Sequence, residues 1–316
     1  MVLTKDHSIE KFHPIDAMNL MLEECMSKTS ESNTDLDEIT HCPINQDGPI
    51  EAHIQQLNLG DNAYVSEFYV GNPPQKLRGL FDTGSTNTWI LNKKTPLKNP
   101  DGSEIPKELS YDETASKTYK KTDQRAAIQF GSGALMGHFV TDDVRLGTCD
   151  GEKSSGQIHI KNQKFGNVEK QKTIFRGNNF EAIIGMAYPE LAEAGVKPVF
   201  DEMMDQKLLK SNVFAFYFTT QEQEAQGALS DMTFGYYDKS KFEGDMTWHN
   251  VDYKYMYGVK LDDVKVAGNN LNICEGRNEG CLITFDSGTS LMSFPTWGAQ
   301  KLSQNKLPTA NNIVPC

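Results

Sequence analysis

The sequence lacks most features that mark a membrane, secreted or metal-binding protein. None of its 316 residues belongs to an apolar run long enough to cross a bilayer, and no apolar signal-peptide core occurs before residue 60. It has no Asn-X-Ser/Thr sequon, no Cys-X-X-Cys pair and no histidines at metal-ligand spacing. We therefore expect no metal, no cofactor and no membrane association, and taken literally the chain is cytosolic.

Basic clusters are also absent, and this excludes one class of partner. The formal net charge is −12, and no run of five or more basic residues interrupts it, so we expect no binding to nucleic acid. Residues 1–60 hold 11 acidic residues against 3 lysines. This composition predicts an acidic N-terminal leader over residues 1–60 that is partly disordered, with one amphipathic helix over Ile15–Met26.

Two near-identical pentapeptides, 204 positions apart, are the most informative feature present. They are Phe81–Ser85 (FDTGS) and Phe285–Thr289 (FDSGT), and each follows a strand-like apolar run. Their glycines permit a tight turn, and their hydroxyls can clamp an exposed carboxylate. A single copy is typical of an ordinary turn, but two matched copies favour a pair of acids presented for chemistry.

Paired carboxylates suit hydrolysis because two such groups in contact do not both ionise. One holds a proton while the other is charged, so a water between them can be deprotonated while a carbonyl is protonated. The sequence thus predicts a hydrolase in which Asp82 and Asp286 are the catalytic residues.

Further motifs extend the likeness from about Ala63 to Cys316, where the chain resembles the pepsin family of aspartic proteases. The motifs that resemble the family's are the first-loop continuation Thr86–Ile90, the active-site flap Ala127–Gly133, and the apolar-apolar-Gly strand within Phe180–Pro189. The resemblance implies an all-β, bilobal fold with one aspartate in each lobe. It also implies a polypeptide substrate, bound extended across the interface between the lobes.

Short β-rich runs separated by Gly and Asn turns agree with this fold class. We predict strands over Ala63–Val70, Ala126–Phe130, His138–Leu146, Val213–Thr219 and Asp231–Gly235, and a helix over Val199–Leu208. We place an N-terminal lobe at residues 61–224 and a C-terminal lobe at 225–316, with the boundary near Glu222–Gly227.

The second lobe is expected to be incomplete, because the chain stops 30 residues after Asp286. Relatives continue through a second apolar-apolar-Gly strand, and a sheet without it has an open edge. Three explanations stay open: a fragment of a longer protein, a protein partner that completes the lobe, or a family scaffold reused without catalysis.

The resemblance also implies roles for the residues that follow each aspartate. Ser85 and Thr289 are placed to hydrogen-bond the outer carboxylate oxygens and orient them. Thr83 and Ser287 resemble residues whose hydroxyls reach across to the backbone of the opposite loop. Each loop is completed by its turn glycine, and these are Gly84 and Gly288.

The flap departs from the family pattern at Phe130, where relatives usually carry a tyrosine bonded to the indole equivalent to that of Trp89. Phenylalanine cannot make this bond, so the indole N–H needs another acceptor. We expect a looser flap and weakened peptide hydrolysis. The flap residues Gly131, Ser132 and Gly133 should still contact an extended peptide.

Among the six cysteines, only Cys274 and Cys281 match the positions of a family disulfide. The others are Cys25, Cys42, Cys149 and Cys316. A chain with so few cysteines at disulfide positions fits a reducing compartment as well as an oxidising one. Members of the family that it resembles usually work in lysosomal, secretory or extracellular spaces.

Two functions from different classes follow. The first is an aspartic-type endopeptidase. The alternative is a catalytically weak or inactive pepsin-like scaffold that serves as a structural or protein-interaction component, which Phe130 and the incomplete lobe favour.

Overall fold

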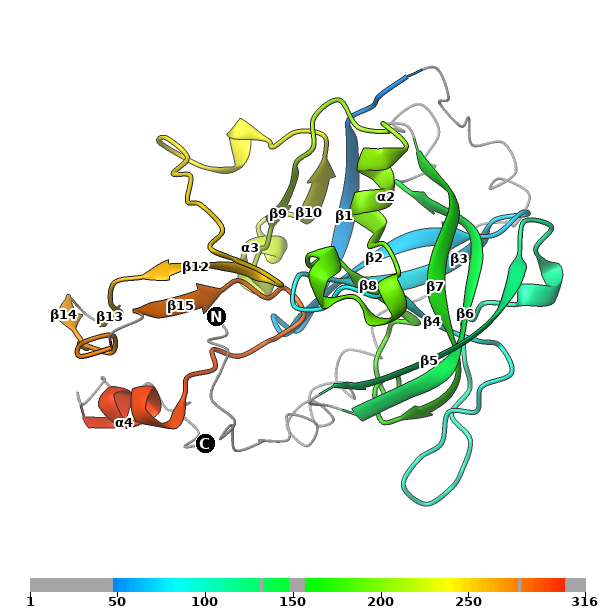
Figure 1. Ribbon diagram of the computed structural model, residues 1–316, viewed down its shortest axis with the longest axis horizontal. Coiled ribbons are helices and arrows are strands. Elements are labelled where there is room, and N and C mark those ends of the chain that lie inside the picture. The colour runs from blue at the N-terminus through cyan, green and yellow to red at the C-terminus, as the bar shows by residue number, and fades with distance from the viewer. Residues whose placement is uncertain (1–47, 131–132, 148–156, 267, 278–279, 305–316) are drawn as a thin grey trace.

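The computed structural model describes residues 48–304 except 131–132, 148–156, 267 and 278–279 (Figure 1). The leader before residue 48, including the helix expected over Ile15–Met26, lies outside the described residues. Within the described part, the fold is all-β, as the sequence predicts.

Ten strands form one large sheet, in the order β5-β6-β7-β4-β8-β3-β2-β1-β10-β9. Their bounds are β1 (Ala52–Leu59), β2 (Ala63–Val70), β3 (Gln75–Asp82), β4 (Trp89–Leu91), β5 (Lys120–Phe130), β6 (Gly133–Leu146), β7 (Ile158–Lys172), β8 (Ala182–Gly185), β9 (Phe214–Tyr217) and β10 (Ser230–Phe234).

Two small sheets follow in the chain and lie to the left in Figure 1. One has the order β11 (Tyr253–Lys254), β12 (Tyr257–Leu261), β15 (Cys281–Thr284), and the other pairs β13 (Lys265–Val266) with β14 (Asn269–Asn270). The α-helices described are α2 (Val199–Asp205), α3 (Gln221–Ala225) and α4 (Thr296–Gln304), and single 3₁₀ turns occur at Glu113–Ala115, Pro189–Leu191, Glu193–Gly195 and Lys239–Lys241.

The strands form where the sequence predicts them. Strand β2 occupies the predicted range, and β5, β6, β9 and β10 overlap the other four. The predicted helix begins at Val199 but ends at Asp205, earlier than expected. Lys207 takes a left-handed φ of 54°, which an α-helix cannot continue through.

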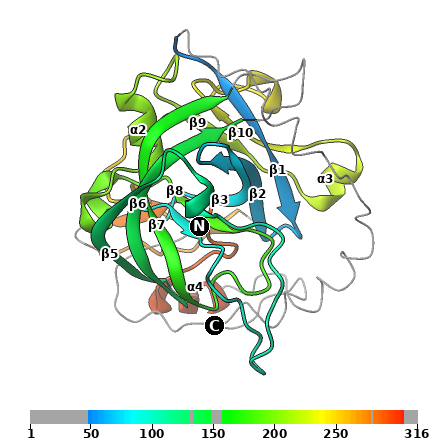
Figure 2. The same ribbon diagram turned by 90° about the vertical axis from the view of Figure 1, so that its right-hand side faces the viewer.

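The boundaries expected for the leader and the lobes differ from the structure. Strand β1 falls inside the expected leader, yet it pairs with β2 on one side and with β10 on the other (Figure 2). Strand β10 falls after the expected lobe boundary, yet it belongs to the large sheet. All ten strands between residues 52 and 234 therefore belong to one hydrogen-bonded sheet.

The buried apolar residues are distributed unevenly between the two parts. Two core clusters pack on the large sheet, one around Phe68, Leu77 and Phe165 and the other around Trp89 and Phe139. Among the described residues after 250, the buried hydrophobic side chains are Leu271, Ile273 and Ile283. The second part thus buries little apolar surface.

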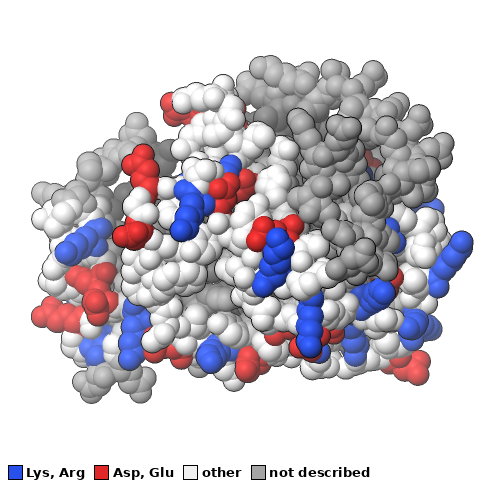
Figure 3. All heavy atoms as spheres, turned by 90° about the horizontal axis from the view of Figure 1, so that it is seen from above, with Lys and Arg blue, Asp and Glu red and all other residues white. Residues whose placement is uncertain are grey.

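The surface carries single charges of both signs, without a large basic patch on the face shown in Figure 3. None of the helices in the described ranges is long and apolar enough to span a bilayer.

Candidate active site

Two loops of matching geometry present the predicted aspartates. Asp82 ends strand β3, and Asp286 follows β15 by two residues. In each loop the turn glycine donates its N–H to the aspartate, Gly84 to Asp82 Oδ1 at 2.9 Å and Gly288 to Asp286 Oδ1 at 2.8 Å. The two predicted turns therefore form, and each fixes one oxygen of its own carboxylate.

The second oxygen of each carboxylate is held by the hydroxyl that the sequence assigns to it. Ser85 Oγ donates to Asp82 Oδ2, and Thr289 Oγ1 donates to Asp286 Oδ2 at 2.8 Å. Each acid is thus held at both oxygens, which restricts the rotation of its carboxyl group.

Reciprocal hydrogen bonds join the two loops. Thr83 Oγ1 donates to the carbonyl of Phe285 at 2.7 Å and accepts the N–H of Ser287 at 2.9 Å. Ser287 Oγ donates to the carbonyl of Phe81 at 2.6 Å and accepts the N–H of Thr83 at 3.0 Å. Thr83 and Ser287 occupy the cross-loop positions predicted for them, and we refer to these four bonds as the cross-loop clamp.

The clamp brings each carboxyl group against the glycine of the opposite loop. A Cβ added to Gly84 would overlap the carboxyl of Asp286, and one added to Gly288 would overlap the carboxyl of Asp82. Such close approach is possible only for residues without a side chain. The two acids therefore share one small space between the loops.

The two carboxyls are not equivalent electrostatically. Asp82 is buried, at 8% exposure, whereas Asp286 is half-buried. Burial raises the pKa of Asp82 to about 7, and the negative charge of Asp286 adds to the rise, while the hydrogen bonds from Ser85 and Gly84 oppose it. Asp82 is consequently the member of the pair whose protonated form is favoured.

Strand β8 supports the first loop from behind. It runs parallel to β3 with Asp82 opposite Gly185, and the N–H of Met186 donates to the Asp82 carbonyl at 2.8 Å. A Cβ on Gly185 would overlap the backbone of Thr86. In the part of the chain that the structure describes, β15 pairs with β12 alone, so the Asp286 loop has no such strand behind it.

The predicted flap is the hairpin of β5 and β6, in which Phe130 pairs with Gly133. Gly131 and Ser132 lie outside the described residues. Phe130 packs against the core cluster that contains Trp89, whose indole N–H is buried and has no hydrogen-bond partner among the described residues. The orphan N–H is the result expected from phenylalanine at position 130.

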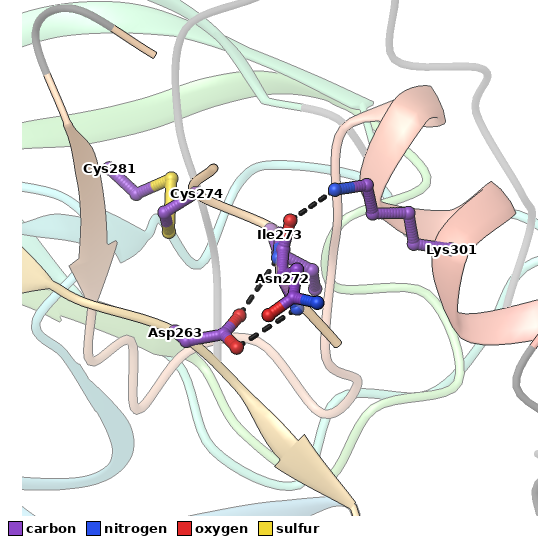
Figure 4. Close-up of a disulfide and its surroundings, with 6 residues drawn as sticks. All are labelled: Asp263, Asn272, Ile273, Cys274, Cys281 and Lys301. Atoms are coloured by element: carbon purple, nitrogen blue, oxygen red, sulfur yellow. Dashed lines mark hydrogen bonds between the residues drawn. A yellow bond between two sulfur atoms is a disulfide. The ribbon is translucent and has the colours of Figure 1, made fainter. Parts of the chain in front are cut away.

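The predicted disulfide joins Cys274 and Cys281, with Cα atoms 5.5 Å apart. Figure 4 shows it beside a loop in which the Asp263 carboxylate accepts the N–H groups of Asn272 and Ile273. Lys301 of α4 donates to the carbonyl of Asn272, so this loop also anchors the helix. The remaining four cysteines lie outside the described residues.

A pocket that sequence reasoning missed opens beside the clamp, with a volume of about 880 Å³. Its walls include Asp201 of α2, Phe214 and Phe216 of β9, and Tyr257 of β12. Phenylalanines at strand spacing are typical of a core, so the sequence carries no signal that distinguishes this pocket from a buried core. Over the described ranges, no three His, Cys, Asp or Glu side chains group as metal ligands.

Comparison with known proteins gives consistent matches. A family model described as eukaryotic aspartyl protease matches residues 63–314. Cathepsin D of Gallus gallus is 36% identical over 248 residues, which cover 78% of this chain and 57% of the relative. Cathepsin D of Homo sapiens is 34% identical over 284 residues, 87% of this chain and 66% of the relative. Cathepsin E of Mus musculus is 33% identical over 249 residues, which cover 76% of this chain and 55% of the relative. The chain therefore spans between about half and two thirds of the length of these relatives.

Proposed function

Because the chain belongs to the eukaryotic aspartyl protease family, we propose that it is an aspartic endopeptidase in which Asp82 and Asp286 activate one water molecule. The observation that carries the proposal is the close approach of the two carboxyls, each lying against the glycine of the opposite loop. A pair held in this way is suited to hold one proton and one water between them.

The reaction follows from the inequality of the two acids. The Asp286 carboxylate takes a proton from the water, and the oxygen of that water bonds to the peptide carbonyl carbon. Asp82, whose protonated form is favoured, gives its proton to the carbonyl oxygen. Asp286 then gives its proton to the amide nitrogen, and Asp82 takes back a proton from a hydroxyl of the tetrahedral intermediate. The C–N bond breaks as the carbonyl re-forms, which releases a carboxylic acid and an amine. No cofactor takes part in these steps.

The substrate we propose is an extended polypeptide that lies between the loops and the β5–β6 hairpin. The hairpin offers backbone groups near Gly133, and Phe130, which is half-buried over the cluster that contains Trp89, supplies an apolar contact. The contacts of Gly131, Ser132 and Gly133 with substrate remain part of this proposal.

The test compares wild-type protein with Asp82→Asn and Asp286→Asn on a denatured protein substrate, at acidic and at neutral pH. We expect wild type to cleave and both variants to lose at least about 100-fold in rate, because neither can share a proton. Asp123→Asn is the matched control, since Asp123 is exposed on β5 and should leave the rate unchanged.

Equal cleavage by wild type and both dyad variants would contradict the proposal. Absence of cleavage by every form at both pH values would favour the second candidate, a pepsin-like scaffold that binds protein partners. The observations that favour this scaffold are the orphan N–H of Trp89 and the pairing of β15 with β12 alone among the described strands.

A further inference from the structure

A row of polar side chains crosses four strands of the large sheet, away from the dyad. Lys76 of β3 lies opposite Tyr69 of β2, and Tyr69 lies opposite Arg145 of β6. Arg145 in turn lies opposite His159 of β7. Residues directly opposite one another point to the same face of a sheet, so these side chains form one row. Six positions (82 minus 76) separate Lys76 from Asp82 along β3, which places the row on the order of 20 Å from the dyad.

Arg145 is a half-buried cation that lacks a carboxylate partner among the described residues. Its Nε is buried there without a hydrogen-bond acceptor. Burial lowers the pKa of Arg145, although the charge of Asp143 opposes the shift. Lys76, at the other end of the row, is by contrast paired with Glu67. Because a buried cation without a partner is costly, the guanidinium of Arg145 favours an anion beside it.

The imidazole of His159 is held in one tautomer by Asp143. Its Nε2 lies 2.8 Å from Asp143 Oδ2, and Asp143 Oδ1 accepts the N–H of Asn162 at 3.1 Å. A carboxylate can only accept, so Nε2 carries the proton and the neutral ring has a lone pair at Nδ1. Within the described ranges, this buried Nδ1 has no partner. It therefore requires a hydrogen-bond donor.

The charges around His159 leave an excess of positive charge. Arg145 and Lys161 act on it as cations, and Asp143 acts on it as an anion. Burial lowers the pKa of His159, the two cations add to the shift, and Asp143 opposes it. The ring is consequently neutral at neutral pH, and two cations stand against one carboxylate that already has its own partners.

We propose that Arg145 and His159 form a binding site for one hydrogen phosphate ion. One oxygen of the ion accepts the Nε–H of Arg145, and its O–H group donates to Nδ1 of His159. Side chains directly opposite on neighbouring strands have Cβ atoms about 5 Å apart, a spacing that a single tetrahedral ion can bridge. The negative charge of the ion offsets the excess positive charge of the cluster.

Other small occupants satisfy fewer of these groups. Sulfate, chloride and carboxylates carry charge but no O–H at neutral pH, so each would place an acceptor against the lone pair of Nδ1. A phosphate monoester has a second pKa of about 6, so its dianion, which has no O–H, dominates at neutral pH. A water molecule can make both hydrogen bonds but brings no charge to offset Arg145.

Isothermal titration calorimetry with inorganic phosphate and with sulfate tests the site at neutral pH. We expect wild-type protein to bind one phosphate per chain, at least about tenfold more tightly than sulfate, because sulfate leaves the buried Nδ1 without a donor. Glycerol phosphate should bind as weakly as sulfate. Equal affinity for glycerol phosphate and inorganic phosphate would overturn the role assigned to the O–H group.

The pH dependence tests His159 without a substitution. As pH falls through the lowered pKa of His159, Nδ1 gains a proton and becomes a donor. Sulfate should then bind more tightly, and the preference for phosphate should disappear towards about pH 5. A preference that stays constant from neutral to acidic pH would contradict the part given to this ring.

Variants separate the site from general charge effects. Arg145→Met should weaken phosphate binding at least about tenfold. Lys170→Met is the matched control, because it removes the same charge from an exposed position at the other end of β7, and it should keep both affinity and preference. Circular dichroism checks folding, and Arg145→Lys, which keeps the charge but lacks Nε–H, serves if Arg145→Met does not fold. Asp82→Asn should bind phosphate as wild type does, so the outcome is independent of the protease assay.

Four results would overturn the proposal. The first is no saturable binding of phosphate to wild type, and the second is equal affinity for phosphate and sulfate at neutral pH. The third is phosphate affinity that survives in folded Arg145→Met. The fourth is binding that appears only in Asp150→Asn/Glu152→Gln, which would assign the guanidinium to an acid of its own chain; both of these acids lie outside the described residues.

Discussion

The absence of a side chain at two positions lets the carboxyls of Asp82 and Asp286 meet. Gly84 and Gly288 each lie against the acid of the opposite loop, where a methyl group would overlap the carboxyl atoms. The hydroxyls of Ser85 and Thr289 hold the outer oxygens, and those of Thr83 and Ser287 join the loops. A handful of small groups thus determines the geometry of the dyad.

Gly84→Ala tests this geometry directly. The added methyl must displace Asp286, so we expect a loss of at least about 100-fold in the rate of peptide hydrolysis, because a small misplacement of reacting groups is costly. Steady-state kinetics measures it. Gly298→Ala in α4 is the control, since its methyl meets only ordinary contacts from 3.6 Å and should leave the rate unchanged. Similar kinetics for the two variants would contradict the packing described.

The raised pKa of Asp82 predicts how stability depends on pH. The pKa of this carboxyl has its ordinary value of 3.8 in the unfolded chain and is raised by burial to about 7 in the folded protein. Between these values the folded state binds more protons than the unfolded state, so the contribution of Asp82 to the free energy of unfolding falls as pH rises from about 4 to about 7. Asp82→Asn removes this slope.

Urea unfolding at several pH values measures the effect. We expect wild type and Asp82→Asn to differ in the pH dependence of their free energy of unfolding by on the order of a few kcal/mol across this range. Parallel curves would show that Asp82 titrates as it does in the unfolded chain. The same titration predicts that hydrolysis declines as pH rises through about 7, when Asp82 loses its proton.

The orphan indole N–H of Trp89 gives a third prediction at this scale. In Phe130→Tyr the new hydroxyl offers an acceptor beside the cluster that holds Trp89, so we expect the free energy of unfolding to rise by about 1 kcal/mol. Chemical denaturation measures it. In a Trp89→Phe background the same change should bring no gain, and an equal gain in both backgrounds would show that the hydroxyl bonds elsewhere.

At the scale of elements, local sequence patterns predict the turns that carry the two aspartates and several of the strands. The other strands depend on pairing between residues far apart in the sequence. Both turns follow from their repeated residues, and β2 lies where alternation predicts it. Strand β1 was not predicted, because its buried positions include the polar Gln56 and Asn58, which hide the alternation. Asn58 is buried because its side chain bonds the carbonyl of Thr219 at 2.9 Å, a partner 161 positions away that no local pattern reveals.

The disulfide between Cys274 and Cys281 closes the loop that leads into β15. The bridge spans 7 positions, from Cys274 to Cys281, and β15 leads directly to Asp286. From the entropy of closing so short a loop, we expect the Cys274→Ser/Cys281→Ser variant to lose about 2.5 kcal/mol of stability. Differential scanning calorimetry checks this, with Cys274→Ala/Cys281→Ala as the matched pair. Unchanged stability in both variants would show that the loop is held by Asp263 and Lys301 alone.

At the scale of the whole molecule, the two aspartate loops belong to parts of unequal stability. The large sheet packs two clusters of buried apolar side chains, whereas the described residues after 250 bury three hydrophobic side chains. Since hydrophobic burial is the main source of stability, local opening should cost far less in the second part. The Asp286 loop is therefore attached to the less stable side.

Hydrogen exchange with mass spectrometry measures this difference. We expect amides of β12 and β15 to exchange at least about tenfold faster than those of β2, β3 and β8, because the small sheet opens without unfolding the large one. Uniform exchange rates across both parts would show instead that the molecule unfolds as one cooperative unit.

The cross-loop clamp also bears on the direction in which a polypeptide lies at the dyad. Thr83 and Ser287 make the same bonds from opposite sides, so turning the pair half a revolution about its local axis leaves the pattern of bonds nearly the same. A centre with that symmetry cannot distinguish the amino end of a bound peptide from its carboxyl end. Polarity must be read from what breaks the symmetry, namely the deeper burial of Asp82 and the β5–β6 hairpin, which among the described strands belongs to the sheet of the Asp82 loop.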